Sequence, residues 1–144
     1  AKQCTTCGFV YYFNPSSAVA CFIRNSKGEL LLVRRAKEPA KGTLDLPGGF
    51  VDMYESAEDA AHREVKEETG LDVTNITYFG NQTWPYPSGL MVGFIADYAG
   101  GEIKLQEEEL SSGDFYTRDN LPELPRKLSL ARKMIDWWLE CSHK

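Results

Sequence analysis

The segment ESAEDAAHREVKEETG, residues 55–70, predicts an amphipathic helix around which the rest of the chain is arranged. Ser56 followed three positions later by Asp59 is typical of a capping box, and Gly70 suits the left-handed residue that ends a helix. We therefore expect a helix over Ala57–Thr69. Its apolar side chains recur at helical spacing and should face a core: Ala57, Ala60, Ala61 and Val65.

Glutamates crowd the second half of this predicted helix. Glu64, Glu67 and Glu68 lie three and four positions apart, so a helix brings them to one face, where like charges destabilise one another. The 144-residue chain has a net charge of −5, and the seven acids and two bases of residues 49–71 account for it. Three carboxylates at this spacing can bind a hard cation such as Mg²⁺ or Mn²⁺. The spacing alone favours a solvated helix face equally.

Apolar runs on both sides of the helix predict a sheet. A loop is expected over residues 38–50, where Pro and Gly interrupt the pattern. A second amphipathic helix is expected over residues 126–140, with Leu128, Ala131, Ile135 and Trp138 facing inward. Five runs predict strands, the first two joined as a hairpin: residues 17–25, 29–36, 73–84, 90–100 and 113–117. This order predicts an α+β domain, a mixed β-sheet sandwiched between α-helices.

Residues 49–71 resemble the Nudix box, G-x5-E-x7-R-E-U-x-E-E-x-G-U, in which U is aliphatic. All nine specified positions match. Chance agreement of the seven exact identities is on the order of 10⁻⁸ per start point, at average residue frequencies. The resemblance implies a single Nudix hydrolase domain over residues 16–144 with the Nudix fold. That family hydrolyses a nucleoside diphosphate linked to another moiety.

The resemblance also implies a role for each residue of the box. The implied ligands of Mg²⁺ or Mn²⁺ are Gly49 through a backbone carbonyl, Glu64, Glu67 and Glu68. Arg63 would orient Glu64, and Glu55 would pair with Arg63. Cations that bridge carboxylates and phosphate oxygens polarise phosphorus and lower the pKa of a bound water. Glu64 or Glu67 would then accept the proton of the attacking water.

A second motif follows the box. NQTWPYPSG, residues 81–89, resembles the S-Q-P-W-P-F-P-x-S motif of NADH pyrophosphatases. On this resemblance, Gln82, Trp84 and Tyr86 are candidate substrate contacts, because prolines hold an aromatic ring ready to stack on a flat base. The alternative is a rigid structural loop with a buried Trp84. Arg34 and Arg35 are candidate phosphate contacts, or else part of a basic surface.

The resemblance favours hydrolysis of an NAD(H)-like dinucleotide to NMN(H) and AMP. ADP-ribose, a nucleotide sugar and a (d)NTP are alternative substrates, and a non-catalytic nucleotide-sensing domain is an alternative of another class. RNA ending in a nicotinamide dinucleotide would be chemically continuous with the first, but the acidic chain shows no evident nucleic-acid surface. Glu55 and Glu109 are candidate additional acids. Ser112 stands where a second acid is common in NADH pyrophosphatases.

Residues 1–15 resemble half of a zinc ribbon. Only Cys4 and Cys7 have ribbon spacing, whereas a structural zinc takes four ligands. Cys21, Cys141, His143 or a second chain would have to complete the site. We therefore expect a vestigial leader without zinc.

Composition limits where the chain resides and what it binds. No apolar run approaches the ~20 residues of a membrane-spanning helix, and no secretory signal is present. We therefore expect a cytoplasmic protein with no membrane contact. The adjacent Trp137 and Trp138 are not expected to face the same core. One is a candidate for a homodimer contact, and packing against the sheet is the alternative.

Overall fold

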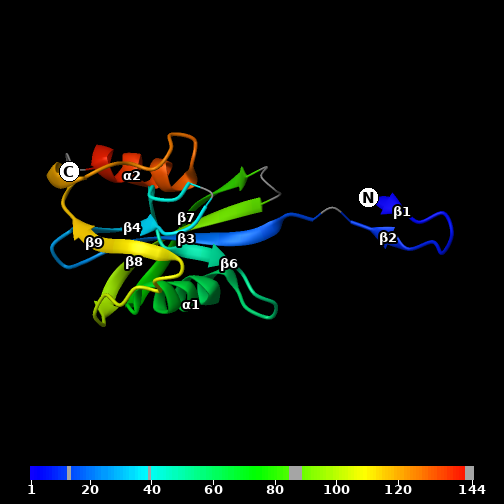
Figure 1. The fold of residues 1–144 in the computed structure, drawn as a ribbon, viewed down its shortest axis with the longest axis horizontal. Helices are drawn as coiled ribbons and strands as arrows, with labels where there is room; N and C mark the ends of the chain where they lie inside the picture. Colours follow the sequence, from blue (N-terminus) through cyan, green and yellow to red (C-terminus); the bar gives the residue numbers. More distant parts are fainter. Residues whose placement is uncertain (13, 39, 85–88, 142–144) are drawn as a thin grey trace.

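A mixed sheet lies between helix α1 (Ala57–Thr69) on one face and helix α2 (Leu130–Glu140) on the other (Figure 1). The computed structural model describes residues 1–144 except 13, 39, 85–88 and 142–144. The predicted α+β fold class is confirmed. Among the described residues the sheet contains these strands: β3 Ser16–Arg24, β4 Leu30–Arg35, β5 Leu44–Asp45, β6 Gly48–Phe50, β7 Asp72–Trp84, β8 Gly89–Gly100 and β9 Leu110–Tyr116.

Strand β3 is the centre of the sheet. The order is β5-β4-β3-β8-β7, while β6 also pairs with β3 and β9 with β4. Strands β3 and β8 are parallel, with Ser16 opposite Gly89 and Arg24 opposite Asp97. The other pairs are antiparallel, including the predicted β3–β4 hairpin.

The prediction of a plain loop over residues 38–50 was wrong. It contains β5 and β6, which have two and three residues and are too short for a periodic signal. Backbone hydrogen bonds define them instead. The N–H of Cys21 donates to the carbonyl of Pro47 at 2.9 Å, and β6 pairs with β3 through Ala20 and Gly48. The glycines are therefore fixed beside the middle of the sheet.

Alternation along β3 divides the core into two layers. Phe22 points to the α2 face and packs with Met134 and Ile135. Cys21 and Ile23 point to the α1 face, because successive side chains of a strand project to opposite sides. Both faces of β3 are buried, so the strand lacks the hydrophobic–polar alternation of a surface strand.

Helix α1 has the predicted bounds and caps. The Ser56 side chain accepts a hydrogen bond from the N–H of Asp59, and the Asp59 side chain accepts from the N–H of Ser56. Gly70 ends the helix with φ of 76°, a left-handed conformation that glycine adopts at little cost. Ala60, Ala61 and Val65 are buried as predicted.

Helix α2 begins at Leu130, four residues after its predicted start. The Ser129 side chain caps it by accepting from the N–H of Arg132 at 3.1 Å. Leu128 therefore lies before the helix and is 78% exposed, so its predicted place on the inner face was wrong. Ala131 and Trp138 are buried as predicted. Ahead of α2 lies a 3-10 turn, η1 (Arg118–Asn120).

The two adjacent tryptophans share one core, contrary to expectation. The Trp138 and Trp137 rings lie 5.6 and 6.3 Å from the Phe22 ring, both edge-on. Trp138 is 2% exposed, and the partly buried Trp137 packs at the margin, 5.5 Å from Phe79. A tryptophan is large enough to reach the core from the flank of the helix. The homodimer stays a prediction.

The N-terminal segment forms a hairpin that extends away from the domain (Figure 1). Strands β1 (Lys2–Gln3) and β2 (Val10–Tyr11) make their own two-stranded sheet. The division of the chain at residues 15 and 16 stays a prediction. Within the described part of the chain, neither α-helix is long and apolar enough to cross a membrane.

Candidate active site

The box helix lies against the glycine strand β6, and the Glu64 carboxylate occupies the space beside Gly49. A Cβ atom on Gly49 would lie 2.5 Å from Cδ of Glu64. A Cβ on Gly48 would lie 1.9 Å from the carbonyl oxygen of Val19. Both contacts are far shorter than van der Waals distance. The first glycine therefore makes room for a carboxylate, and the second lets β6 approach β3.

Arg63 is the hub of the carboxylates. Its Nη2 donates to Oε1 of Glu55 at 2.7 Å, and its Nη1 donates to Oε1 of Glu64 at 2.8 Å and to Oε2 of Glu67 at 3.1 Å. Nη2 also donates to the carbonyl oxygen of Phe50 at 2.9 Å. Hydrogen bonds from Arg63 hold the pKa of Glu55 below its usual range. One guanidinium thus fixes both the helix carboxylates and the loop after β6.

Glu68 contacts the strand β6. Its Oε2 accepts a hydrogen bond from the N–H of Gly48 at 3.2 Å. Burial, together with the negative charges of Glu64, Glu109 and Asp45, raises the pKa of Glu68 to about 8, although the hydrogen bond from Gly48 opposes the shift. Burial also raises the pKa of Glu64, although Arg63 opposes this. Nearby positive charge is therefore too small to offset the cost of ionising these two half-buried carboxylates.

The donor set suits a hard cation. Carboxylate oxygens and the backbone carbonyls of β6 are ligands that Mg²⁺ and Mn²⁺ accept, and a cation would offset the charge that raises the pKa of Glu68. In the described ranges, no three His, Cys, Asp or Glu side chains are gathered closely enough to hold an ion as they stand. Arg63 and Gly48 hold these carboxylates separately. The metal ligands Gly49, Glu64, Glu67 and Glu68 thus stay a prediction.

Without a metal, the stability of the fold is expected to fall as the pH rises from about 4.5 to about 8. The pKa of Glu68 is raised from 4.5 to about 8 on folding, so the folded state holds a proton that the unfolded state releases. This contribution is full below the unfolded pKa and is lost through the folded one. Urea unfolding in EDTA at a series of pH values measures it. Glu68→Gln should flatten the dependence; an equally steep slope in that variant would contradict the assignment.

A cavity of about 370 Å³ lies on the other face of the sheet, under α2. Ala20, Leu44 and Met91 contribute strand side chains, and Leu130 and Ala131 line it from α2. A mostly apolar cavity of this size is typical of a small-molecule site. Its walls come from strands of the sheet, from α2 and from the segment that precedes α2.

Some of the predicted substrate-binding residues line this cavity, and others contact only neighbouring protein segments. Trp84 and Arg35 line the cavity. Arg34 does not: it pairs with Glu123 at 3.7 Å and donates to the carbonyl of Gly42. Tyr86 lies outside the described residues. The roles of Trp84, Arg35 and Tyr86 in binding stay predictions.

Gln82 contacts the segment that precedes α2. Its Nε2 donates to the carbonyl oxygen of Leu128 at 2.6 Å. Its Oε1 is buried and, among the described residues, has no hydrogen-bond partner. Gln82 thus contacts the segment before α2, in which Arg126 and Ser129 line the cavity, and its role in substrate binding stays a prediction.

Glu109 lies near the box although it is distant in sequence. Its Oε1 accepts from Nζ of Lys37 at 2.9 Å, and its charge helps to raise the pKa of Glu68. It is therefore close enough to influence that carboxylate. Ser112 pairs with Arg34 across β9 and β4.

Cys4 and Cys7 lie on the exposed turn between β1 and β2. Backbone N–H groups of Cys7 and Thr6 lower the pKa of the Cys4 thiol. Cys21 does not complete a site with them, because it is buried in the core between β3 and α1, whereas Cys4 and Cys7 are exposed on the hairpin. Burial raises the pKa of the Cys21 thiol to about 12. The absence of zinc stays a prediction, and His143 lies outside the described residues.

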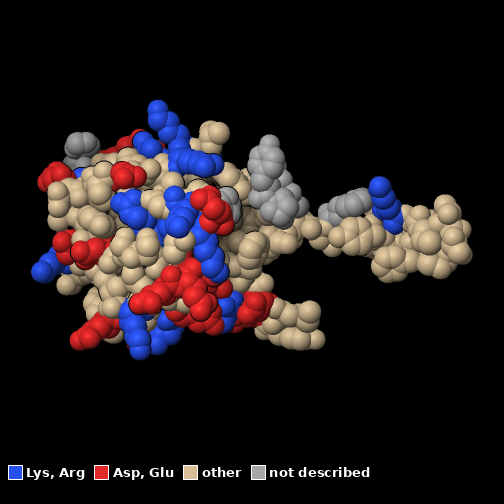
Figure 2. All heavy atoms as spheres, in the orientation of Figure 1, with Lys and Arg blue, Asp and Glu red and all other residues tan. Residues whose placement is uncertain are grey.

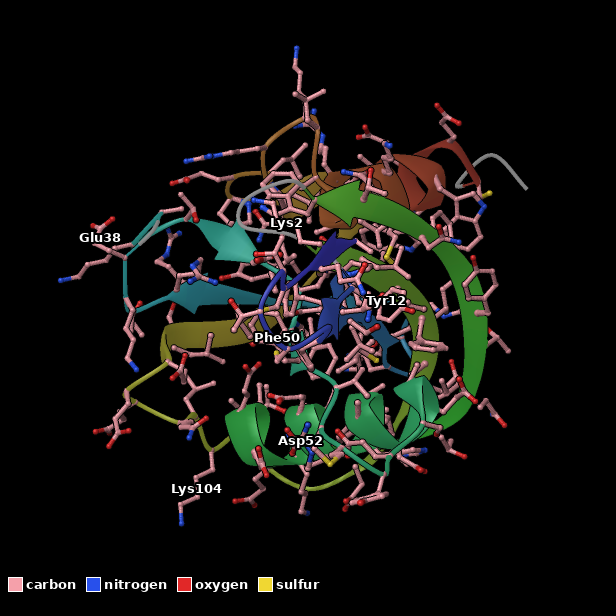
Figure 3. The ribbon with its side chains drawn as sticks, turned by 90° about the vertical axis from the view of Figure 1, so that its right-hand side faces the viewer. Lys2, Tyr12, Glu38, Phe50, Asp52 and Lys104 are labelled. Atoms are coloured by element: carbon pink, nitrogen blue, oxygen red, sulfur yellow. The ribbon has the colours of Figure 1, made fainter. Side chains whose placement is uncertain are left out.

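Sequence reasoning missed two residues beside the box. Phe50 follows Gly49 directly and is 60% exposed. In the view from the hairpin end, Phe50 and Asp52 lie on the segment between the sheet and α1 (Figure 3). Asp45 is partly buried on β5, and desolvation raises its pKa. The sequence could have indicated Phe50, because an aromatic residue directly follows the two glycines. It contained no signal for Asp45, because the two-residue strand β5 is too short to recognise.

Acidic side chains gather over α1, and basic side chains gather beside them over the region between β4 and α2 (Figure 2). The mixed sheet between two helices and the carboxylate-bearing helix α1 are the features expected of a Nudix domain. The model of the NUDIX domain family matches residues 14–138, and the chain belongs to that family.

Similar proteins extend the match to almost the whole chain. A Pseudomonas aeruginosa protein named NAD-capped RNA hydrolase NudC is 39% identical over 137 residues, which are 95% of this chain and 49% of that protein. A protein of the same name from Haemophilus influenzae is 42% identical over 143 residues, 97% of this chain and 54% of that protein. This chain therefore spans about half the length of these relatives. The predicted resemblance to NADH pyrophosphatase-like proteins is confirmed.

A solved structure shares the fold. The NUDIX hydrolase from Nitrosomonas europaea superposes with a TM-score of 0.79 at 23% identity, covering 98% of this chain and 79% of that one. At this identity the likeness supports the fold alone. It agrees with the mixed sheet and the two flanking helices.

Proposed function

We propose that this chain hydrolyses the pyrophosphate bond of a nucleoside diphosphate linked to another moiety. The observation that carries the proposal is the pair of half-buried carboxylates, Glu64 against Gly49 and Glu68 on Gly48, with pKa values raised by burial. Such a pair is unfavourable in isolation and becomes favourable when a cation is shared with an anionic substrate. Mg²⁺ or Mn²⁺ fits these oxygens.

The residues of the box divide the work. Gly49, Glu64, Glu67 and Glu68 would hold the cation, which would supply charge neutralisation and an activated water. Hydrogen bonds from Arg63 fix the positions of the Glu64 and Glu67 carboxylates before the cation binds, and a hydrogen bond to Glu55 fixes Arg63. Glu67 is the better placed proton acceptor, because its side chain is 53% exposed whereas that of Glu64 is 15% exposed. Glu109 adds negative charge beside Glu68.

The proposed substrate is an NAD(H)-like dinucleotide, cleaved to NMN(H) and AMP. The name of the relatives supports it, as does the cavity under α2, which is large enough for one nucleotide half. An RNA with a nicotinamide dinucleotide at its 5′ end is a second candidate on the same grounds. ADP-ribose, nucleotide sugars and (d)NTPs remain alternatives, as does a nucleotide-sensing role without catalysis.

A substrate panel tests the proposal. NADH, an NAD-capped RNA, ADP-ribose, a nucleotide sugar and a dNTP are each incubated with Mg²⁺ and with Mn²⁺, and products are separated by chromatography. We expect AMP and NMNH from NADH, and no turnover in EDTA. Turnover of dNTP alone would favour the alternative substrates. If no compound is cleaved with either metal while nucleotides still bind, the sensing role is correct.

A further inference from the structure

The cavity under α2 has room for one part of a dinucleotide. Its volume of about 370 Å³ is near the lower end of small-molecule sites, which are about 300–1,000 Å³. The carboxylates of the box lie on the α1 side, while Leu130 and Ala131 close the cavity on the α2 side. Ala20, which lines the cavity, pairs with Gly48, and the N–H of Gly48 donates to the Glu68 carboxylate, so the cavity adjoins the box. A substrate cleaved at the box can therefore place one nucleotide in this cavity and leave the other outside.

Arg126 is a cavity residue with an unused positive charge. It lines the cavity and is exposed. Neighbouring arginines are neutralised by carboxylates: Arg34 pairs with Glu123, and Arg132 with Asp136 at 3.0 Å. The Arg126 guanidinium has no such partner among the described residues. Figure 2 places basic side chains on this part of the surface, apart from the acidic side chains over α1.

The backbone at Arg126 is held in place before any ligand arrives. Its carbonyl oxygen accepts from the N–H of Ser129 at 3.0 Å and from the Ser129 hydroxyl at 2.7 Å. Arg132 donates to the preceding carbonyl, that of Pro125, at 3.2 Å. Gln82 secures the same segment through Leu128. A fixed attachment point reduces the entropy lost when the side chain binds a ligand.

We propose that Arg126 binds a phosphate monoester on the ribose of the nucleotide held in the α2 cavity, so that the protein prefers dinucleotides carrying this additional phosphate. The inference rests on the proposed function, since it concerns the substrate of the same site. The scissile pyrophosphate would bind at the box carboxylates through their cation. Arg126 is therefore available to bind a different anionic group of the substrate. A guanidinium presents two parallel N–H groups that match phosphate oxygens.

Calorimetric titration tests the preference without any chemical step. The probes are AMP, adenosine 2′,5′-bisphosphate and adenosine 3′,5′-bisphosphate. We expect one bisphosphate to bind about tenfold or more tightly than AMP, as charge-assisted hydrogen bonds to phosphate allow. The bisphosphate that binds more tightly shows whether Arg126 recognises a phosphate at the 2′ or the 3′ position of the ribose. Equal binding of all three would overturn the inference.

Matched variants assign the effect to the side chain. Arg126→Gln should reduce the ratio of bisphosphate to AMP affinity to near one, and Arg126→Lys should restore part of it. Lys127→Gln removes a neighbouring charge that does not line the cavity and should keep the ratio. An unchanged ratio in Arg126→Gln would also overturn the inference. A preserved preference in a protein that cleaves nothing would refute the proposed function and leave this binding site standing.

Discussion

Replacing Glu68 with glutamine is expected to lower pyrophosphate hydrolysis by about a thousandfold. Glutamine keeps the size of the side chain and an oxygen that can accept from the N–H of Gly48. It removes the negative charge that a cation requires. Metal-ion stabilisation of the transition state contributes several kcal/mol. Each ~1.4 kcal/mol that is lost slows the reaction tenfold, so a loss of ~4 kcal/mol gives the thousandfold decrease. Initial rates with NADH over a range of Mg²⁺ concentrations measure the change.

A second glutamate of the same helix supplies the control. Glu58 is exposed in the first turn, and Glu58→Gln makes the same chemical change away from the sheet. That variant should retain nearly all activity. Thermal unfolding in EDTA should show Glu68→Gln to be at least as stable as the unchanged protein, because its buried carboxyl no longer ionises. Full activity in Glu68→Gln would remove Glu68 from the metal site.

Gly49→Ala is expected to lower activity by about a hundredfold while the protein remains folded. The new methyl group would lie 2.5 Å from Cδ of Glu64, and a glutamate can relieve this clash by moving its flexible end. The carboxylate would then leave its position between Arg63 and β6. A displacement of about 1 Å at a reacting centre costs on the order of 10²-fold in rate. Steady-state rates and circular dichroism measure the two effects separately.

Two other glycines make this result specific. A Cβ on Gly80 would have no heavy atom within 4 Å, so Gly80→Ala should leave hydrolysis nearly unchanged. Gly48→Ala would press against the backbone of Val19, which cannot move aside, and should destabilise the whole fold. If Gly49→Ala cleaved NADH at the normal rate, the Glu64 carboxylate would not need its position for catalysis.

Helix α1 could be predicted completely because its signals are local. Ser56, Asp59 and Gly70 act on backbone groups within four residues, and the alanine stripe repeats often enough to be counted. The same local spacing placed three glutamates on one helix. It could not tell which partner holds each of them, because Gly48 approaches Glu68 through the pairing of β6 with β3.

The errors arose where a local stop signal was overlooked or where tertiary contacts decide the arrangement. Residues 126–129 continue the helical pattern, but Pro125 and the capping Ser129 set the true start of α2. Trp137 and Trp138 project from different sides of the helix, yet their rings are long enough to reach Phe22 together. The cavity was not predictable at all, since its walls come from segments far apart in the sequence.

The parallel pairing of β3 with β8 has a consequence for how the chain folds. It joins Arg24 to Asp97, which are 73 residues apart, and α1 lies in the intervening segment. Pairings over such separations form slowly, because a long loop must close before any contact is gained. The acidic helix is thus synthesised well before the strand that completes its supporting sheet. A helix of this length has marginal stability without tertiary contacts, so we expect the box helix to become fully stable during translation only after β8 has left the ribosome.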